Sequence, residues 1–229
     1  MSIEDRKREA AEAAVRLVHD DMVVGLGTGS TAFYAIEALI RRHRDEGLRI
    51  RCIPTSSVSE RQAREGGLPL TDFAAVPFLD ITIDGADEID IDTLDLVKGL
   101  GGALLWEKIV AAATRTLVII ADDRKLVSGL GATVKVPVEV VPFGWQATSE
   151  RLTRLGATPI LRVAKTGGPF RTDENNLILD CVFGPIPDAV LLERALSDTV
   201  GVVETGLFIG MADIAFVATP TGVRELRPA

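Results

Sequence analysis

The sequence predicts an α/β protein built on a parallel β-sheet and followed by a smaller α+β segment. Short apolar runs rich in β-branched residues alternate with helical patterns, which is typical of a parallel sheet. Several of these runs end in loops rich in glycine or in acidic residues. Near Lys135 the pattern changes, because the predicted elements become shorter and proline and glycine stand at their joints.

The first half of the chain alternates between helices and strands. Alanine and leucine recur at helical spacing in the first helix, and the last strand is wholly apolar. We expect, in order, a helix over 4–19, a strand over 22–26, a helix over 32–44, a strand over 49–54, a helix over 59–65, a strand over 78–83, a helix over 103–114 and a strand over 117–121.

The second half mixes shorter strands and helices without a regular alternation. We expect a strand over 136–141, a helix over 148–155, strands over 159–163 and 176–181, a helix over 188–197, and strand-like apolar sequence over 207–218.

Composition limits the chemistry. The 229 residues include 25 Lys and Arg against 33 Asp and Glu, so a formal charge of −8 disfavours nucleic acid and anionic lipid as partners. Residues 1–21 are too charged for a signal peptide, and the uncharged stretch 22–36 is too short and polar to span a bilayer. Two distant cysteines fit a cytoplasmic protein. The two histidines, His19 and His43, lie in charged helical stretches, which disfavours imidazole catalysis and zinc.

The loop of residues 27–31, with the sequence GTGST, joins a predicted strand to a helix. Amides and hydroxyls at such a helix N-terminus favour an anion. A Walker A loop would need a lysine after Gly29, and a dinucleotide fingerprint would need a third glycine at Ser30. A smaller phosphorylated ligand, or a simple glycine turn, remains.

Acidic residues crowd the next strand end in the sequence DGADE, residues 84–88. An EF-hand is excluded because Ala86 and Ile89 stand where ligand and glycine positions are required. A magnesium site, a solvated acidic turn, and carboxylates that bind sugar hydroxyls or move protons remain, and the last fits best.

Two further loops carry lysines. Lys98 precedes a glycine loop, and Glu107 follows in the first turns of the next helix, where the helix dipole and desolvation oppose each other in setting its pKa. Lys125 follows the strand over 117–121 and could reach the same crevice at the carboxyl ends of the strands.

Taken together, GTGST, DGADE, KGxGGA followed by Glu107-Lys108, and the AD-x-x-K sequence at 121–125 resemble ribose-5-phosphate isomerase type A. Residues 137–142 and 201–208 are also similar to this family, so the resemblance spans nearly the whole chain. Trp106 stands where many members carry a polar or basic residue, and Asp123-Arg124 replaces small residues.

The resemblance implies a Rossmann-like catalytic domain over 1–129 and 206–229 with a smaller inserted α+β domain over 130–205. It implies interconversion of D-ribose 5-phosphate and D-ribulose 5-phosphate in the pentose phosphate pathway, without metal or cofactor, by a homodimer or homotetramer. The implied catalytic residues are Glu107, Asp84, Asp87 and Lys98. The implied substrate-binding residues are Thr28, Gly29, Ser30, Thr31, Asp84, Gly85, Ala86, Asp87, Lys98, Gly99, Leu100, Gly101 and Lys125, with Lys7 as a further candidate for the phosphate.

The chemistry of such an isomerase matches these residue types. A base must remove the C2 proton and return one to C1, and the intermediate oxyanion needs stabilisation. Glu107 is the candidate base, Lys98 and the glycine amides are candidates for the oxyanion, and Asp84 and Asp87 could assist ring opening.

Two competing functions differ in class. A sugar-phosphate deaminase or lactonase would rely on a histidine, and neither histidine lies in a strand-end loop. A non-catalytic sugar-phosphate sensor would need the phosphate loop but not the pair of Lys98 and Glu107.

Overall fold

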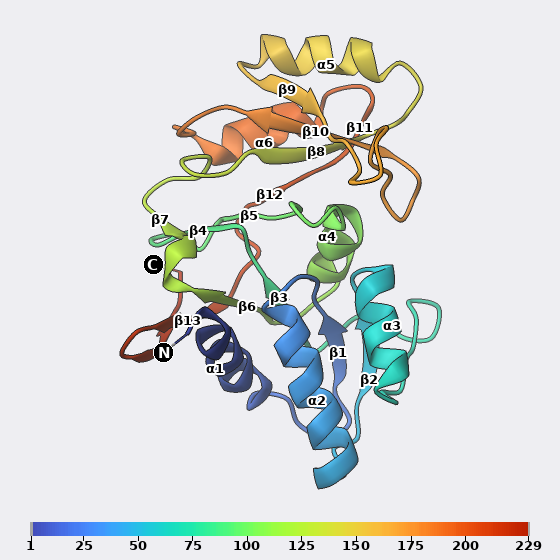
Figure 1. Ribbon diagram of the computed structural model, residues 1–229, viewed down its shortest axis with the longest axis vertical. Coiled ribbons are helices and arrows are strands. Elements are labelled where there is room, and N and C mark those ends of the chain that lie inside the picture. The colour runs from blue at the N-terminus through green and yellow to red at the C-terminus, as the bar shows by residue number, and fades with distance from the viewer. Residues whose placement is uncertain (1, 229) are drawn as a thin grey trace.

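The computed structural model describes residues 2–228 and contains three β-sheets arranged along its long axis (Figure 1). The largest sheet has the strand order β14-β13-β6-β3-β1-β2. Its strands are β1 (Val23–Leu26), β2 (Arg51–Pro54), β3 (Ile81–Gly85), β6 (Leu117–Asp122), β13 (Ile214–Thr219) and β14 (Gly222–Leu226). All neighbours are parallel except β14, which pairs antiparallel with β13 at the edge. The expected parallel α/β sheet is therefore confirmed.

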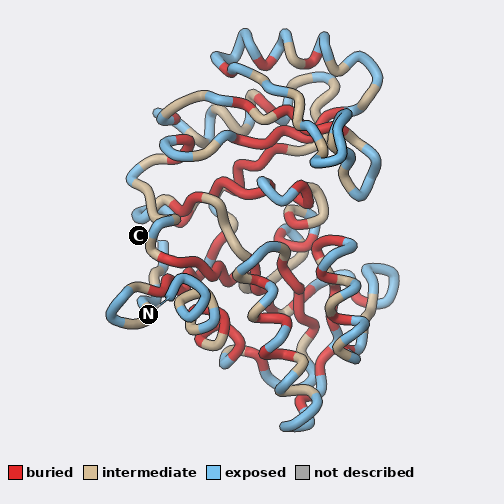
Figure 2. The backbone as a smooth tube through the Cα atoms, in the orientation of Figure 1, coloured by how far each residue is buried: buried red, intermediate tan, exposed pale blue. Residues whose placement is uncertain are grey.

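Both faces of this sheet are covered. Helices α1 (Ile3–Val15) and α2 (Ala32–Glu46) share a hydrophobic core with Val118 and Ile120 of β6, whereas Ile119 packs in a second core with Ala111 of α4 (Leu104–Ala112). This split follows from the alternation of side chains along a strand. Helix α3 (Ser57–Glu65) follows β2, and its Ala63 packs in the first core. Figure 2 shows the buried strands as continuous segments between the exposed outer faces of the helices.

A four-stranded antiparallel sheet, in the order β11-β8-β10-β9, forms the smaller part of the molecule. Its elements are β8 (Val136–Val140), α5 (Trp145–Arg154), β9 (Thr158–Leu161), β10 (Leu177–Val182), α6 (Ala189–Ser197) and β11 (Val202–Thr205). All of these fall between residues 130 and 205, and the domain division proposed from the sequence stays a prediction.

The third sheet lies between the two larger ones (Figure 1). It has the order β12-β5-β4-β7, from β4 (Glu88–Asp90), β5 (Leu96–Val97), β7 (Leu126–Val127) and β12 (Leu207–Phe208). Strands β4 and β5 are neighbours in the chain, whereas β7 and β12 come from two distant parts of it. Among residues 2–228, no helix is both long and apolar enough to cross a bilayer.

Two sequence expectations need correction. The first helix ends at Val15 rather than at residue 19: the next amides, of Leu17 and Val18, bond three residues back, and the guanidinium of Arg42 binds the carbonyls of Val15 and Val18, at 2.7 and 2.9 Å. The apolar stretch 207–218 is two strands in two different sheets, separated by Gly210 with a φ of +62°. Other expected boundaries differ by a few residues, and β4, β5, β7, β11 and β14 were not predicted.

Candidate active site

The carboxyl ends of β1, β3 and β6 meet beside a cavity of about 220 Å³. Strand β1 is followed in the chain by β2 on one side of it and pairs with β3 on the other, and ligands of open α/β sheets bind at such a switch point. The cavity brings together all four loops singled out in the sequence. Its lining residues are Lys7, Thr28, Gly29, Ser30, Thr31, Gly85, Ala86, Asp87, Lys98, Gly99, Gly101, Glu107, Asp122, Arg124 and Lys125.

Lys98 is the centre of the site. Its side chain is 3% exposed, and its ammonium lies 3.0 Å from Asp84 Oδ2 and 2.9 Å from Glu107 Oε1. It also donates a hydrogen bond to the carbonyl of Gly85 at 2.6 Å. Three acceptors therefore match the three protons of the ammonium. Lys98 directly follows β5 and Glu107 lies in α4, and the glycine loop between them brings the two side chains together.

Asp84 is buried behind this lysine and does not line the cavity. Its Oδ1 accepts hydrogen bonds from the amides of Thr28, at 2.9 Å, and Gly85, at 2.7 Å. A side chain at Gly27 could not fit, because a Cβ there would lie 2.3 Å from Asp84 Oδ1. Asp84 therefore ties the loop after β1 to the end of β3.

The surroundings of Lys98 and Glu107 shift the pKa of each side chain. Burial raises the pKa of Glu107 to about 7, because the desolvation of its carboxylate outweighs the attraction of Lys98. Burial alone would lower the pKa of Lys98, but the carboxylates of Asp84 and Glu107 outweigh it and raise that pKa above its ordinary value. Lys98 is therefore a fixed cation, and Glu107 can exchange a proton near neutral pH.

The loop after β1 lines the cavity with backbone amides that can donate hydrogen bonds. Within residues 2–228, the amides of Gly29, Ser30 and Thr31 donate to no acceptor, and α2 begins directly afterwards at Ala32. The N-terminus of a helix attracts anions for this reason. The hydroxyl of Thr28 is engaged elsewhere, with those of Thr55 and Ser56. The donors at this end are thus mainly backbone amides and the hydroxyls of Ser30 and Thr31.

The glycine loop over 99–102 forms the opposite wall. The amide of Leu100 donates to Asp87 Oδ2 at 3.0 Å, while the side chain of Leu100 is exposed and does not line the cavity. Gly99 and Gly102 have φ values of +93° and +91°, which side chains rarely adopt. Asp87 is half-buried and, unlike Asp84, faces the cavity.

Basic side chains complete the rim beside the loop after β1. Lys125 lines the cavity and pairs with no carboxylate of the described chain. Lys7 of α1 is held 3.0 Å from Glu4, and Arg124 is held 2.7 Å from Asp122 at the end of β6. Asp122 and Arg124 were not predicted as site residues, although their place directly after a strand was a usable signal.

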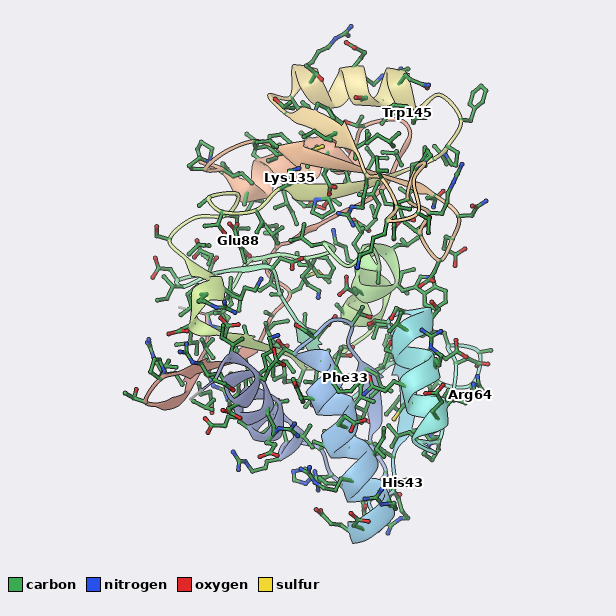
Figure 3. All side chains as sticks on the ribbon, viewed as in Figure 1. Phe33, His43, Arg64, Glu88, Lys135 and Trp145 are labelled. Atoms are coloured by element: carbon green, nitrogen blue, oxygen red, sulfur yellow. The ribbon has the colours of Figure 1, made fainter. Side chains whose placement is uncertain are left out.

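Several sequence alternatives lose support from this geometry. His19 follows α1 and His43 lies near the end of α2 that is remote from the cavity (Figure 3), and neither lines the cavity. No three His, Cys, Asp or Glu side chains of residues 2–228 gather as metal ligands would. The oxygens of Asp84, one half of the suggested magnesium pair, are already bound by two amides and Lys98.

Comparison with known proteins is consistent across sequence and structure. Residues 51–222 match the family model of ribose 5-phosphate isomerase A (phosphoriboisomerase A). The chain is 51% identical to ribose-5-phosphate isomerase A of Synechococcus sp., over 99% of this chain and 98% of the relative. It is 52% identical to that of Gloeobacter violaceus, over 100% of this chain and 99% of the relative.

Solved structures agree. Ribose 5-phosphate isomerase A from Methanocaldococcus jannaschii superposes with a TM-score of 0.95 at 40% identity, covering 99% of this chain and 100% of that one. A D-ribose-5-phosphate isomerase in complex with phospho-erythronic acid gives 0.96 at 39% identity, with the same coverage. The expected Rossmann-like α/β fold class is confirmed by these matches. This chain is an isomerase and belongs to the ribose 5-phosphate isomerase A family.

Proposed function

We propose that this enzyme interconverts D-ribose 5-phosphate and D-ribulose 5-phosphate through an enediolate, with Glu107 as the base. The observation that carries the proposal is the position of Glu107 in the cavity, with its pKa raised to about 7 and its Oε1 2.9 Å from Lys98. A base with a pKa near the working pH is the most efficient proton-transfer group. The phospho-erythronic acid bound to the solved relative is itself a phosphorylated sugar acid.

The phosphate binds, in this proposal, at the amides of Gly29, Ser30 and Thr31. Lys125 and Lys7 supply positive charge on the same side of the cavity, within a chain whose formal net charge is −8. Binding the phosphate at a point remote from the reacting carbons supplies energy that orients those carbons. The sugar then extends from the α2 N-terminus towards Glu107.

The furanose ring opens before isomerisation, and Asp87 is the carboxylate that faces the cavity for this step. Asp84 does not contact the substrate in this proposal. Its role is to keep Lys98 charged, together with Glu107. The proposal therefore gives the two aspartates different roles.

Proton transfer follows on the open-chain aldose. Glu107 removes the C2 proton, the C–H electron pair forms the C1=C2 double bond, and the C1 carbonyl oxygen becomes an oxyanion. A proton moves from O2 to O1, the O2 electron pair forms the new carbonyl, and Glu107 returns its proton to C1. The ammonium of Lys98 and the amides of the glycine loop stabilise the oxyanion during this sequence.

The direct test replaces Glu107 by glutamine. Glu107→Gln keeps an acceptor for Lys98 but cannot take a proton, so we expect turnover to fall by about 10²- to 10⁴-fold, with ribose 5-phosphate binding largely kept. Turnover is measured as ketose formation, and binding by calorimetry. Glu65→Gln, at an exposed position on α3, is the matched control. A Glu107→Gln enzyme with wild-type turnover would remove Glu107 as the base.

A further inference from the structure

An arginine of the small antiparallel sheet contacts the catalytic glycine loop. Arg162 directly follows β9, and its side chain is 12% exposed. Its Nη1 donates to the carbonyls of Gly99, at 3.1 Å, and Leu100, at 3.0 Å. These carbonyls belong to the loop that joins Lys98 to Glu107, although Arg162 comes more than fifty residues later in the sequence.

The guanidinium is held rigidly in this position. Its Nε donates to Asp180 Oδ2 at 3.0 Å, and Nη2 donates to the other oxygen of the same carboxylate. A two-pronged pair of this kind fixes the plane of the guanidinium. The ring of Phe170 lies 5.7 Å from the guanidinium carbon and also packs on the loop, where a Cβ at Gly102 would lie 2.5 Å from it.

Holding the carbonyls sets the direction of the next amides. In a trans peptide the carbonyl and the N–H point in opposite directions. The Gly99 carbonyl points to Arg162, and the Leu100 N–H of the same peptide donates to Asp87 on the opposite side, at 3.0 Å. The Leu100 carbonyl also points to Arg162, so the Gly101 N–H is directed the other way, towards the cavity that Gly101 lines. Within residues 2–228 this Gly101 amide donates to no acceptor.

We propose that Arg162 is a positioning residue for the isomerisation: by binding the carbonyls of Gly99 and Leu100, it directs the Leu100 amide to Asp87 and the Gly101 amide towards the substrate. The Leu100 amide fixes Asp87, and the Gly101 amide donates to the reacting oxygen. The loop needs a contact such as Arg162 from outside it, because glycines at 99, 101 and 102 allow its peptides to flip at low energetic cost. This inference rests on the proposed function and assigns a catalytic contribution to the small domain.

The test compares Arg162→Ala and Arg162→Lys with a matched control on the same hairpin. Arg171→Ala removes an exposed guanidinium whose only hydrogen bond among residues 2–228 is to the carbonyl of Asn175. We expect Arg162→Ala to lower kcat for ribose 5-phosphate by about 10- to 100-fold, because amides are misdirected in the transition state, while KM changes by less than about 3-fold. Arg162→Lys keeps the positive charge but cannot bind Asp180 and both carbonyls at once. Its kcat should lie between those of the wild type and Arg162→Ala. Millimolar guanidinium should restore part of the activity of Arg162→Ala and none of that of Glu107→Gln.

Each outcome decides the question. Wild-type kcat in a folded Arg162→Ala or Arg162→Lys enzyme overturns the proposal, and so does a loss that appears only in KM. If Arg162→Ala does not fold, Arg162→Lys with its kcat and circular dichroism spectrum is decisive alone. If the wild-type enzyme forms no ketose from ribose 5-phosphate, the proposed function fails instead, and the two failures are thereby distinguished.

Discussion

At the residue scale, the site depends on one lysine that is shared between two carboxylates. Lys98 binds Asp84 and Glu107 at 3.0 and 2.9 Å, so the cluster holds one positive charge and either one or two negative charges. Protonation of Glu107 gives the neutral pair of Lys98 and Asp84, which a buried site tolerates better than an excess carboxylate. The cost of keeping this excess carboxylate buried is what raises the pKa of Glu107 to about 7.

The pH dependence of activity tests this balance. Glu107 must be ionised to accept a proton, so kcat/KM should fall as the pH drops below about 7, the raised pKa of Glu107. Lys98→Met removes the cation that lowers the pKa of Glu107, so the acid limb of the pH profile should move to higher pH. The value of kcat should also fall. The measurement is the pH profile of kcat/KM, with Lys165→Met at an exposed position as the control. A wild-type limb near the ordinary glutamate pKa, or one that Lys98→Met leaves in place, would contradict the assignment.

Residue types and spacing in the sequence were enough to single out Glu107, Lys98 and Lys125. All three line the cavity. Lys125 does so because the loops after parallel strands meet at one edge of the sheet, whereas Lys98 follows β5 of the third sheet and Glu107 lies in α4. The sequence could not separate Asp84 from Asp87, since the burial of Asp84 depends on its packing against Gly27 and Lys98 in the folded structure. Arg162 could not be predicted either, because its contact with the glycine loop depends on how two separate sheets are oriented.

At the element scale, β8 carries a buried carboxylate beside the start of α4. Glu139 is fully buried, and its Oε1 accepts hydrogen bonds from Thr172, at 2.8 Å, and Asn176, at 2.9 Å. Its Oε2 has no hydrogen-bond partner within residues 2–228. The same residue lines a small hollow with the first residues of α4, which begins without a side-chain cap.

Glu139 should make stability depend on pH. Desolvation raises its pKa above the ordinary value, so the folded protein binds this proton more tightly than the unfolded chain does. The resulting stabilisation is complete below the unfolded pKa and is lost as the pH rises through the folded pKa. Glu139→Gln carries no such charge, so its free energy of unfolding should decline less than that of the wild type as the pH is raised from about 4.

Urea denaturation at a series of pH values measures this difference. Glu150→Gln, on the exposed face of α5, is the control and should follow the wild type. Parallel pH curves for Glu139→Gln and the wild type would show that the Glu139 carboxyl is not destabilised by burial.

Elements could be predicted where the local sequence signal is strong, as in the apolar run of β6 and the helical spacing of apolar residues in α2. Strands β4, β5 and β7 of the third sheet could not, because each has only two or three residues, and the pairings of β4 with β7 and of β5 with β12 join segments far apart in the sequence. Strand β5 pairs with β12, so that Val97 lies opposite Leu207. Hydrophobic pattern carries no information about such a pairing, because β5 and β12 lie before and after the whole antiparallel sheet in the sequence.

At the scale of the whole molecule, the carboxylate of Glu88 in the third sheet binds the segment that leads into the antiparallel sheet. Glu88, in β4, is fully buried and lies between the sheets (Figure 3). It accepts hydrogen bonds from the amides of Gly131, Thr133 and Val134 and from the Thr133 hydroxyl, at 2.5–3.1 Å. These donors belong to the segment that leads into β8. Glu88 therefore fixes the entry to the antiparallel sheet, and with it the sheet that carries Arg162.

Replacing Glu88 by glutamine should weaken the molecule as a whole. In Glu88→Gln an NH₂ group replaces one carboxylate oxygen, so buried N–H groups that donated to that oxygen lose their acceptor. We therefore expect a loss of about 2–4 kcal/mol in the free energy of unfolding. Urea denaturation at neutral pH measures it, with the exposed Glu150→Gln as the matched surface control. A loss no larger than that of the control would show that other contacts between the sheets orient the antiparallel sheet. If the orientation depends on Glu88, the same variant should also lower kcat, because Arg162 reaches the glycine loop only from a correctly placed β9.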